Sequence, residues 1–323
     1  MDVLSDVLAL VRLQSSIHFC PELSAPWGIE VPTQTDRAVF FLISRGSCYL
    51  EIEGSETPIS LVGGDLVMLP HGAGHILRDR PDSPAITLAE LMKDGCPSER
   101  PRALRHGGGG EKSTMVSGYF KFENRATNYL FSTLPNLILI RTEDGQAVPW
   151  LDATLKFLAA ESSSNVPGAQ TVMARLTDVL FIQIMRAHIL RSNETEETCQ
   201  KKAGILRAFA DPQIGKAFEL IHQQPDHSWT VAELATRIGL SRTSFATRFM
   251  QVAGITPLDY VRKWRMLKAS DLLLQGENNL DEIAGRVGYE SGVAFSKAFK
   301  REIGIPPGLY RREQAVAQQS GIR

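Results

Sequence analysis

A helical pattern that occurs twice near the carboxyl end constrains the fold of this chain more than any other feature. Five aromatic, glycine and proline positions return 50 residues later: Phe245, Phe249, Gly254, Pro257 and Tyr260 match Phe295, Phe299, Gly304, Pro307 and Tyr310. Matches at one fixed offset indicate a structural unit that the chain uses twice. The residues between these positions differ, so we expect two units with one scaffold and different exposed surfaces.

Each copy predicts a helix-turn-helix unit. A short helix, VAELATRI or LDEIAGRV, is followed by a turn at Gly239 or Gly288, where glycine permits a left-handed backbone, and by a second helix that opens at a serine. Phenylalanines four residues apart set the buried face of this second helix, so its opposite face is available for a DNA major groove. The residues predicted to meet bases and phosphates are Arg242, Thr243, Ala246, Thr247, Arg248, Ser291, Val293, Ser296, Lys297, Lys300 and Arg301. Alternatively, the two units are helical hairpins that pack on another element, and the phenylalanines serve only as core.

The distribution of charge favours a partner that carries phosphate. The whole chain has a net charge of −1, but residues 226–313 hold 13 Lys and Arg against 10 Asp and Glu, a balance of +3. The remaining residues therefore carry −4. The positive end of the molecule lies on the repeated segment, as expected for a segment that meets nucleic acid.

The length of 323 residues exceeds what one small core accommodates and predicts more than one domain. Short apolar runs with Gly and Pro punctuation between about residues 31 and 122 indicate a β sandwich or small barrel, which we place in a first domain of residues 1–134. The other predicted parts are a helical region at 135–192, a polar linker at 193–204, the repeated helical domain at 205–315 and a tail at 316–323. The helical region is more apolar than one packing face requires, so it either packs on the β domain or pairs with its copy in a homodimer.

A family resemblance can be stated from these residues. The segments WTVAELATRIGLSRTSFATRFMQVAGITPLDYVRKWRM and GYESGVAFSKAFKREIGIPPGLYRR resemble the DNA-binding domain of the AraC/XylS family of bacterial transcription regulators. The resemblance implies that two recognition helices enter successive major grooves of an asymmetric site. It places Thr243, Ala246, Thr247, Val293, Ser296 and Lys297 where members touch bases. Ala246 and Thr247 are small where some members have longer side chains, so the first helix is expected mainly to anchor the domain.

The amino-terminal part resembles a second known fold. GGDLVMLPHGAGHIL resembles the second conserved motif of cupin barrels, and LSAPWGIEVP and DVLSDVLALVRLQ resemble the cupin-bearing branch of AraC-type regulators. The resemblance implies an α+β chain, with an N-terminal cupin-like β-barrel and flanking helices that sense a signal. Its C-terminal all-α domain has two helix-turn-helix units joined by a long helix. A barrel of this kind encloses space for a small ligand, and the expected effector-binding residues are Phe40, Tyr49, Met68 and His75.

A cupin enzyme is the alternative from another functional class. Metal cupins usually supply two histidines and a carboxylate from their first motif, but AVFFLISRGSCYLEIEG contains no histidine. His71 and His75 alone make a poor metal site. We therefore expect no metal, no cofactor and no catalysis. An oxygenase or isomerase with a helical appendage would instead hold stoichiometric metal.

The cysteines raise the possibility of redox sensing. Cys20, Cys48, Cys96 and Cys199 form no CxxC motif, and in a cytosolic chain they are expected to be reduced thiols. Some relatives of the resembled branch sense oxidants through barrel cysteines. That resemblance makes Cys20 a redox candidate and Cys96 its possible resolving thiol, although Ser117 stands at the other expected position. An oxidant sensor within the same regulator framework therefore remains an alternative.

Location and partners follow from the same features. The amino-terminal MDVLSDVLALVRL lacks a basic region and reads as an amphipathic helix, and no tract of about 18 apolar residues occurs. We expect a cytoplasmic protein without membrane association. The expected partners are double-stranded DNA, a small-molecule or oxidant effector, a second copy of the chain and, if the protein is an activator, RNA polymerase.

Overall fold

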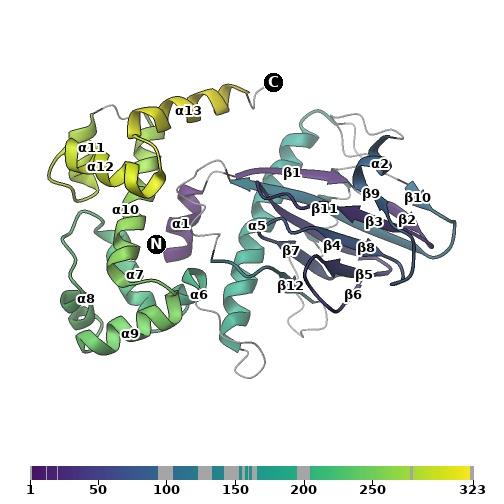
Figure 1. The fold of residues 1–323 in the computed structure, drawn as a ribbon, viewed down its shortest axis with the longest axis horizontal. Helices are drawn as coiled ribbons and strands as arrows, with labels where there is room; N and C mark the ends of the chain where they lie inside the picture. Colours follow the sequence, from purple (N-terminus) through teal and green to yellow (C-terminus); the bar gives the residue numbers. More distant parts are fainter. Residues whose placement is uncertain are drawn as a thin grey trace. The chain divides into compact units, whose positions relative to one another are not determined.

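The computed structural model describes residues 2–11, 13–19, 21–93, 105–122, 133–141, 153–154, 157–158, 160–161, 166–194, 204–276 and 279–320. The chain folds into two compact units (Figure 1). The β unit comprises residues 13–121 and 135–188, and the helical unit comprises residues 1–12, 122–134 and 189–323. The first residues of the chain therefore belong to the helical unit, whereas the sequence prediction placed them in a domain of residues 1–134.

The β unit consists of two sheets. The larger has the order β10-β2-β11-β4-β7-β12, with β1 also paired to β11, and the smaller has the order β6-β5-β8-β3-β9. The strands of the larger sheet are β1 (Leu13–Phe19), β2 (Glu22–Ser24), β4 (Ala38–Arg45), β7 (Leu66–Leu69), β10 (Arg105–Gly107), β11 (Lys112–Phe122) and β12 (Ile138–Ile140). Those of the smaller sheet are β3 (Gly28–Val31), β5 (Ser47–Ile52), β6 (Ile59–Val62), β8 (His75–Arg78) and β9 (Ile86–Thr87). The predicted cupin-like fold is confirmed, but within the described strands the sheets stay open and form no closed barrel.

Both faces of the larger sheet are buried, which explains the long apolar runs of its strands. Phe41 and Ile43 of β4 pack between the two sheets, in one core with Leu50 of β5. Phe40 points to the other face, because successive side chains of a strand alternate. There it stacks on Phe120 with ring centres 4.7 Å apart. This outer face is covered by α5 (Ala169–Glu194), whose Phe181 lies 5.0 Å from Phe120 between ring centres.

The short helix α2 (Leu88–Lys93) follows β9 directly and packs Leu88 and Leu91 against the core of the β unit. The longer helix α5 continues two residues past the predicted boundary at residue 192, and most of the predicted linker lies outside the described residues. No helix in the described part of the chain is long and apolar enough to cross a lipid bilayer.

The helical unit contains the repeat. Its helices are α1 (Val3–Leu10), α6 (Ile205–Phe209), α7 (Ile214–Gln223), α8 (Val231–Arg237), α9 (Arg242–Ala253), α10 (Pro257–Leu274), α11 (Leu280–Arg286), α12 (Gly292–Ile303) and α13 (Pro307–Ser320). The pairs α8–α9 and α11–α12 are the two helix-turn-helix units, and the 18 residues of α10 join them. At 1.5 Å per residue, α10 is about 27 Å long. The predicted all-α domain with two units and a long connecting helix is confirmed.

The two helix-turn-helix units share the same helix caps and turn residues. Ser241 and Ser291 cap the second helix of each pair by accepting a hydrogen bond from the backbone N–H three residues later. The turn glycines, Gly239 and Gly288, both have φ of 75°. A side chain is disfavoured at that φ, so glycine relieves strain in the tight turn between the helices. The predicted turn chemistry is therefore present in both copies.

The first helix-turn-helix unit, α8–α9, shares its core with the amino-terminal helix α1. Val3, Val7 and Leu10 of α1 are buried in one cluster with Phe218 of α7 and Trp264 of α10. These three positions repeat every three to four residues, so they line one face of α1. Asp2 caps this helix by accepting from the Ser5 N–H at 2.8 Å. The amphipathic helix predicted at the start of the chain is thus a structural part of the helical unit.

Candidate functional site

The second helices of the two units, α9 and α12, present the predicted DNA-facing residues. Phe245 and Phe249 of α9, and Phe295 and Phe299 of α12, are completely buried. The opposite faces are accessible: Arg242, Thr243, Thr247, Arg248, Val293, Lys297, Lys300 and Arg301 are exposed, and Ala246, Ser291 and Ser296 are partly buried. Each helix therefore offers an accessible face opposite its buried phenylalanines.

The face of α12 combines cations with an apolar group. Neither Lys297 nor Lys300 has a carboxylate partner in the described part of the chain. Val293 is 68% exposed. Short apolar groups of this kind suit thymine methyl groups, and lysines suit phosphates and guanine edges. Ser291 acts as the helix cap, so its hydroxyl is already engaged with the backbone.

On the exposed face of α9, one of the predicted DNA-contacting cations, Arg248, is paired with a carboxylate of the protein. The Arg248 guanidinium lies 3.0 Å from a carboxylate oxygen of Asp211. The other oxygen of Asp211 accepts backbone hydrogen bonds from Gln213 and Ile214 at the start of α7. Burial raises the pKa of Asp211, but these hydrogen bonds and the guanidinium outweigh it and hold the pKa below its usual range. Arg248 therefore binds α9 to α7 as well as facing solvent.

Arg265 is a residue that the sequence prediction did not single out. It lies in the middle of α10 and is partly buried. Its guanidinium donates to the carbonyl oxygens of Pro225 at 2.7 Å, His227 at 2.9 Å and Gly288 at 3.2 Å. A Cβ at Gly288 would lie only 2.6 Å from this guanidinium. Arg265 thus connects the segment before α8 with the turn of the second unit, and it orients one unit against the other.

A buried histidine beneath α1 is the second feature missed from sequence. The ring of His222 in α7 is stacked on Trp264 with ring centres 3.5 Å apart, and its Nε2 lies 2.5 Å from the Tyr260 hydroxyl. Its Nδ1 lies 3.4 Å from a carboxylate oxygen of Asp6 in α1. Burial, with a smaller contribution from the positive charge of Lys268, lowers the pKa of His222 to about 3. The ring is therefore neutral despite the nearby carboxylate. A helical periodicity that includes a histidine among apolar positions was the available signal.

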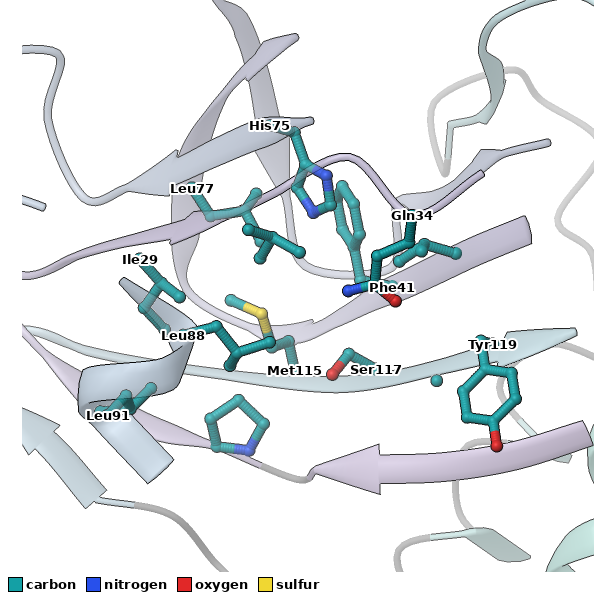
Figure 2. Close-up of a pocket in the computed structure, with 14 residues that line it drawn as sticks. Ile29, Gln34, Phe41, His75, Leu77, Leu88, Leu91, Met115, Ser117 and Tyr119 are labelled. Carbon is teal, nitrogen blue, oxygen red and sulfur yellow. The ribbon is translucent and has the colours of Figure 1, made fainter. Parts of the chain in front are cut away.

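The β unit contains a cavity of about 70 Å³ between its two sheets (Figure 2). One water molecule needs about 10–15 Å³ of such volume, so the cavity has room for a small ligand. Apolar side chains from β3, β8, α2 and β11 line one part of it: Ile29, Leu77, Leu88, Leu91 and Met115. Figure 2 shows His75, Gln34 and Ser117 grouped at the other part, with Phe41 beside His75. The site is thus mostly apolar with a small group of polar atoms.

Of the four residues predicted to bind an effector, the structure brings only His75 to this cavity. Phe40 lies on the outer face under α5, and Met68 is its direct partner across β4 and β7, so Met68 shares that face. Tyr49 lies on the opposite side of β5 from the core residues Cys48 and Leu50. Ser117, considered in the sequence only as the replacement of a cysteine, lines the cavity instead.

The remaining predictions concern cysteines and metals. The redox candidates Cys20 and Cys96 lie outside the described residues. Cys48 is buried, and burial raises the pKa of its thiol to about 12, so it is an inert core residue. Across the residues that the structure describes, no group of three or more His, Cys, Asp or Glu side chains is arranged to hold a metal ion.

Comparisons with known proteins agree with this architecture. A cupin family model matches residues 2–190, and a helix-turn-helix domain model matches residues 234–313. The chain is 31% identical to an AraC-like transcription regulator of Streptomyces lividans, over 98% of this chain and 100% of that protein. It is 28% identical to the transcriptional regulator AlkR of Acinetobacter baylyi, over 97% and 100% of the two chains. The solved C-terminal domain of AraT, a response regulator from Geobacillus stearothermophilus, is 34% identical and covers 32% of this chain and 86% of that chain, with a TM-score of 0.31.

Proposed function

Because this chain belongs to the AraC-like transcription regulators that carry an N-terminal cupin domain, we propose how its parts divide the work of a DNA-binding regulator. The second recognition helix, α12, reads bases. The first, α9, mainly anchors the domain on phosphates. The cavity of the β unit binds an effector that changes DNA binding. The observation that carries this proposal is that Arg248 of α9 is paired with Asp211, whereas Lys297 and Lys300 of α12 have no carboxylate partner among the described residues.

The repeated scaffold supports the assignment of both helices to DNA. A recognition helix must be held rigidly from behind and left open in front. Both conditions hold for α9 and α12, since their phenylalanines are buried and their opposite faces are accessible. Arg265 adds a fixed relation between the two units through its three backbone contacts. Two grooves of one site can therefore be contacted at a defined spacing.

Selection of bound fragments from genomic DNA by the full-length protein, at about 150 mM salt, tests the DNA-binding part. We expect one enriched asymmetric motif with two half-sites about one helical turn, ~34 Å, apart. Binding to that motif should weaken steeply between about 50 and 200 mM salt, because phosphate contacts release counterions. A symmetric motif, or affinity that does not change with salt, would contradict the proposed mode of binding.

The effector-binding part rests on the cavity between the sheets. Ser117 faces this cavity from the middle of β11 and is partly buried, so a larger side chain there should fill the space. We expect Ser117→Leu to keep the affinity for the selected DNA site but to abolish its response to an effector. A reporter gene behind the selected site, exposed to cell extracts or growth conditions that change its expression, measures this. Ser60→Leu, on β6 outside the lining, is the control that should still respond.

We also propose that α5 pairs with its copy in a homodimer. Its inner face is buried on the larger sheet, yet Val172 and Val179 are 42% and 45% exposed. Their spacing of seven residues puts them on one side of the helix. Val179→Asp should shift the protein to monomer in sedimentation velocity, whereas Thr171→Asp, exposed but away from that side, should not. An unchanged sedimentation coefficient for Val179→Asp would contradict this pairing.

A further inference from the structure

We infer that the cavity of the β unit selects an uncharged amphiphile, with an apolar body and a neutral head that donates a hydrogen bond to His75. This inference rests on the proposed role of the cavity as the effector site. It specifies the chemical class of the ligand.

The first argument is the state of His75. The ring is 4% exposed, and its Nδ1 lies 2.9 Å from the carbonyl oxygen of Ala73. A carbonyl oxygen only accepts, so Nδ1 must carry the hydrogen. Burial lowers the pKa of His75, although the hydrogen bond to Ala73 opposes this, and the ring is neutral. Its Nε2 is therefore a hydrogen-bond acceptor.

The second argument is that this acceptor has no partner. Within the described residues, His75 makes only the Ala73 hydrogen bond and a stack on Phe41, with ring centres 5.6 Å apart. The ring belongs to the lining of the cavity (Figure 2). A molecule bound in the cavity can therefore reach the His75 ring. A hydroxyl or amide N–H on a ligand would supply that partner.

The third argument is the absence of charge from the lining. The polar side chains grouped with His75 are Gln34 and Ser117, which are neutral and able to donate or accept. No Lys, Arg, Asp or Glu is among the described residues that line this cavity. The guanidinium of Arg37, which lies 4.5 Å from the centre of the Tyr119 ring, is already paired with Asp36. A ligand carboxylate or ammonium would lose its hydration here without gaining an opposite charge.

The fourth argument is the apolar part of the lining. Leu77, Leu91 and Met115 are each 5% exposed or less, and together with Leu88 of α2 they line the part away from His75 (Figure 2). Burial of a ligand methylene against such side chains contributes favourably without any directional requirement. The site therefore fits a short alkyl or aryl body joined to one neutral polar group.

Isothermal titration calorimetry of the full-length protein at pH 7.5 tests the inference with three probes of equal length: 1-hexanol, hexanoate and hexylammonium. We expect 1-hexanol to bind at least about tenfold more tightly than either ion, because only the alcohol avoids burying a charge. His75→Leu should remove most of the affinity for 1-hexanol. His106→Leu, on β10 and outside the lining, should leave it unchanged.

A gain-of-charge variant provides a second readout if the His75 variant does not fold. Gln34 is only partly buried, so Gln34→Lys places a cation at the polar group with little disturbance of the core. This variant should reverse the ranking in favour of hexanoate. Equal or tighter binding of hexanoate by the parent protein, no binding of any probe, or an unchanged ranking in Gln34→Lys would overturn the inference.

The DNA affinity measured in the same samples separates this inference from the proposed function. If 1-hexanol binds with the expected ranking and changes the affinity for the selected DNA site, both hold. If it binds with that ranking and leaves DNA affinity unchanged, the ligand class holds and the proposed effector role fails.

Discussion

The two helix-turn-helix units use one backbone design but are supported differently. In the first unit, α8 and α9 share a core with α6, α7, the beginning of α10 and the amino-terminal α1. In the second unit, α11 and α12 share a smaller core with the end of α10 and with Tyr310 of α13. The first unit thus depends on residues more than 200 positions away in the sequence. The second is assembled from one continuous segment.

The exposed faces of α9 and α12 also differ, in whether their cations are paired with carboxylates of the protein. The first unit uses Arg248 to hold α9 against Asp211 of α7, whereas Lys297 and Lys300 of the second have no carboxylate partner in the described part of the chain. Arg248, on the helix with the larger supporting core, is therefore partly committed to the protein. This difference is the basis for proposing that α9 anchors the domain and that α12 reads bases.

The largest expected effect comes from disrupting the packing of α1 on the first helix-turn-helix unit, because the second unit has no such support. Val7→Asp places a charge in the core beneath α1 and should lower the free energy of unfolding of the first unit by about 3–5 kcal/mol. Hydrogen exchange should show α7, α8 and α9 losing protection before α11 and α12. Ala9→Asp, exposed on the same helix, is the matched control. Equal loss of protection in both units would mean that α1 stabilises the domain as a whole.

The second largest effect is expected from acid, which should lower the stability of the first helix-turn-helix unit more than that of the second, because only the core of the first contains a buried histidine. The folded-state pKa of His222 is lowered to about 3, against about 6.5 in an unfolded chain. Between these values the unfolded state binds the extra proton, so stability is complete above about pH 6.5 and is lost as the pH falls toward 3. The loss amounts to at most ~1.4 kcal/mol per pH unit.

Urea unfolding between pH 7 and pH 4.5 measures this dependence. His222→Gln retains a hydrogen-bond partner for Tyr260 but cannot titrate, so its stability should fall less steeply with pH. His227→Gln, at a partly exposed histidine that pairs with Glu233, is the control. A pH dependence unaffected by His222→Gln would show that other titrating groups dominate the acid response.

Replacing one cation on each recognition helix tests the functional side of the comparison. Lys297→Ala should weaken binding to the selected DNA site by about 1–3 kcal/mol. Arg248→Ala should cost less, about 1 kcal/mol or below, because its guanidinium is shared with Asp211. Fluorescence anisotropy on the same labelled duplex measures both variants. The reverse order of losses would assign the reading role to α9.

The smallest effect is expected at the exposed valine of α12. Val293→Ser should reduce affinity by about 1 kcal/mol or less, and only for sites that place a thymine methyl group opposite this position. Parallel anisotropy measurements on duplexes with thymine or uracil at each position of the half-site would reveal the contact. A uniform loss over all duplexes would indicate an effect on α12 itself and not on base recognition.

The helix-turn-helix units were predictable because their signals are local. Serine caps, a turn glycine and phenylalanines four residues apart act within about twenty residues of chain, and all of them stand in both copies. The cupin-like strands were also predictable, from their apolar runs and Gly and Pro punctuation. The lining of the cavity was not. Alternation shows that Phe40 and Phe41 face opposite sides, but with both faces of the sheet buried it does not tell which side is inner.

The sequence by itself determined that this chain carries two helix-turn-helix units with different exposed faces behind a β domain. Only the tertiary structure decided that α1 completes the core of the first unit, that Arg265 ties the two units together, and that His75, not Phe40 or Met68, reaches the cavity. The physical reason is the range of the interactions. Helix periodicity, caps and turns are set by neighbours along the chain, whereas a packing partner 200 residues away leaves no spacing that a single sequence displays.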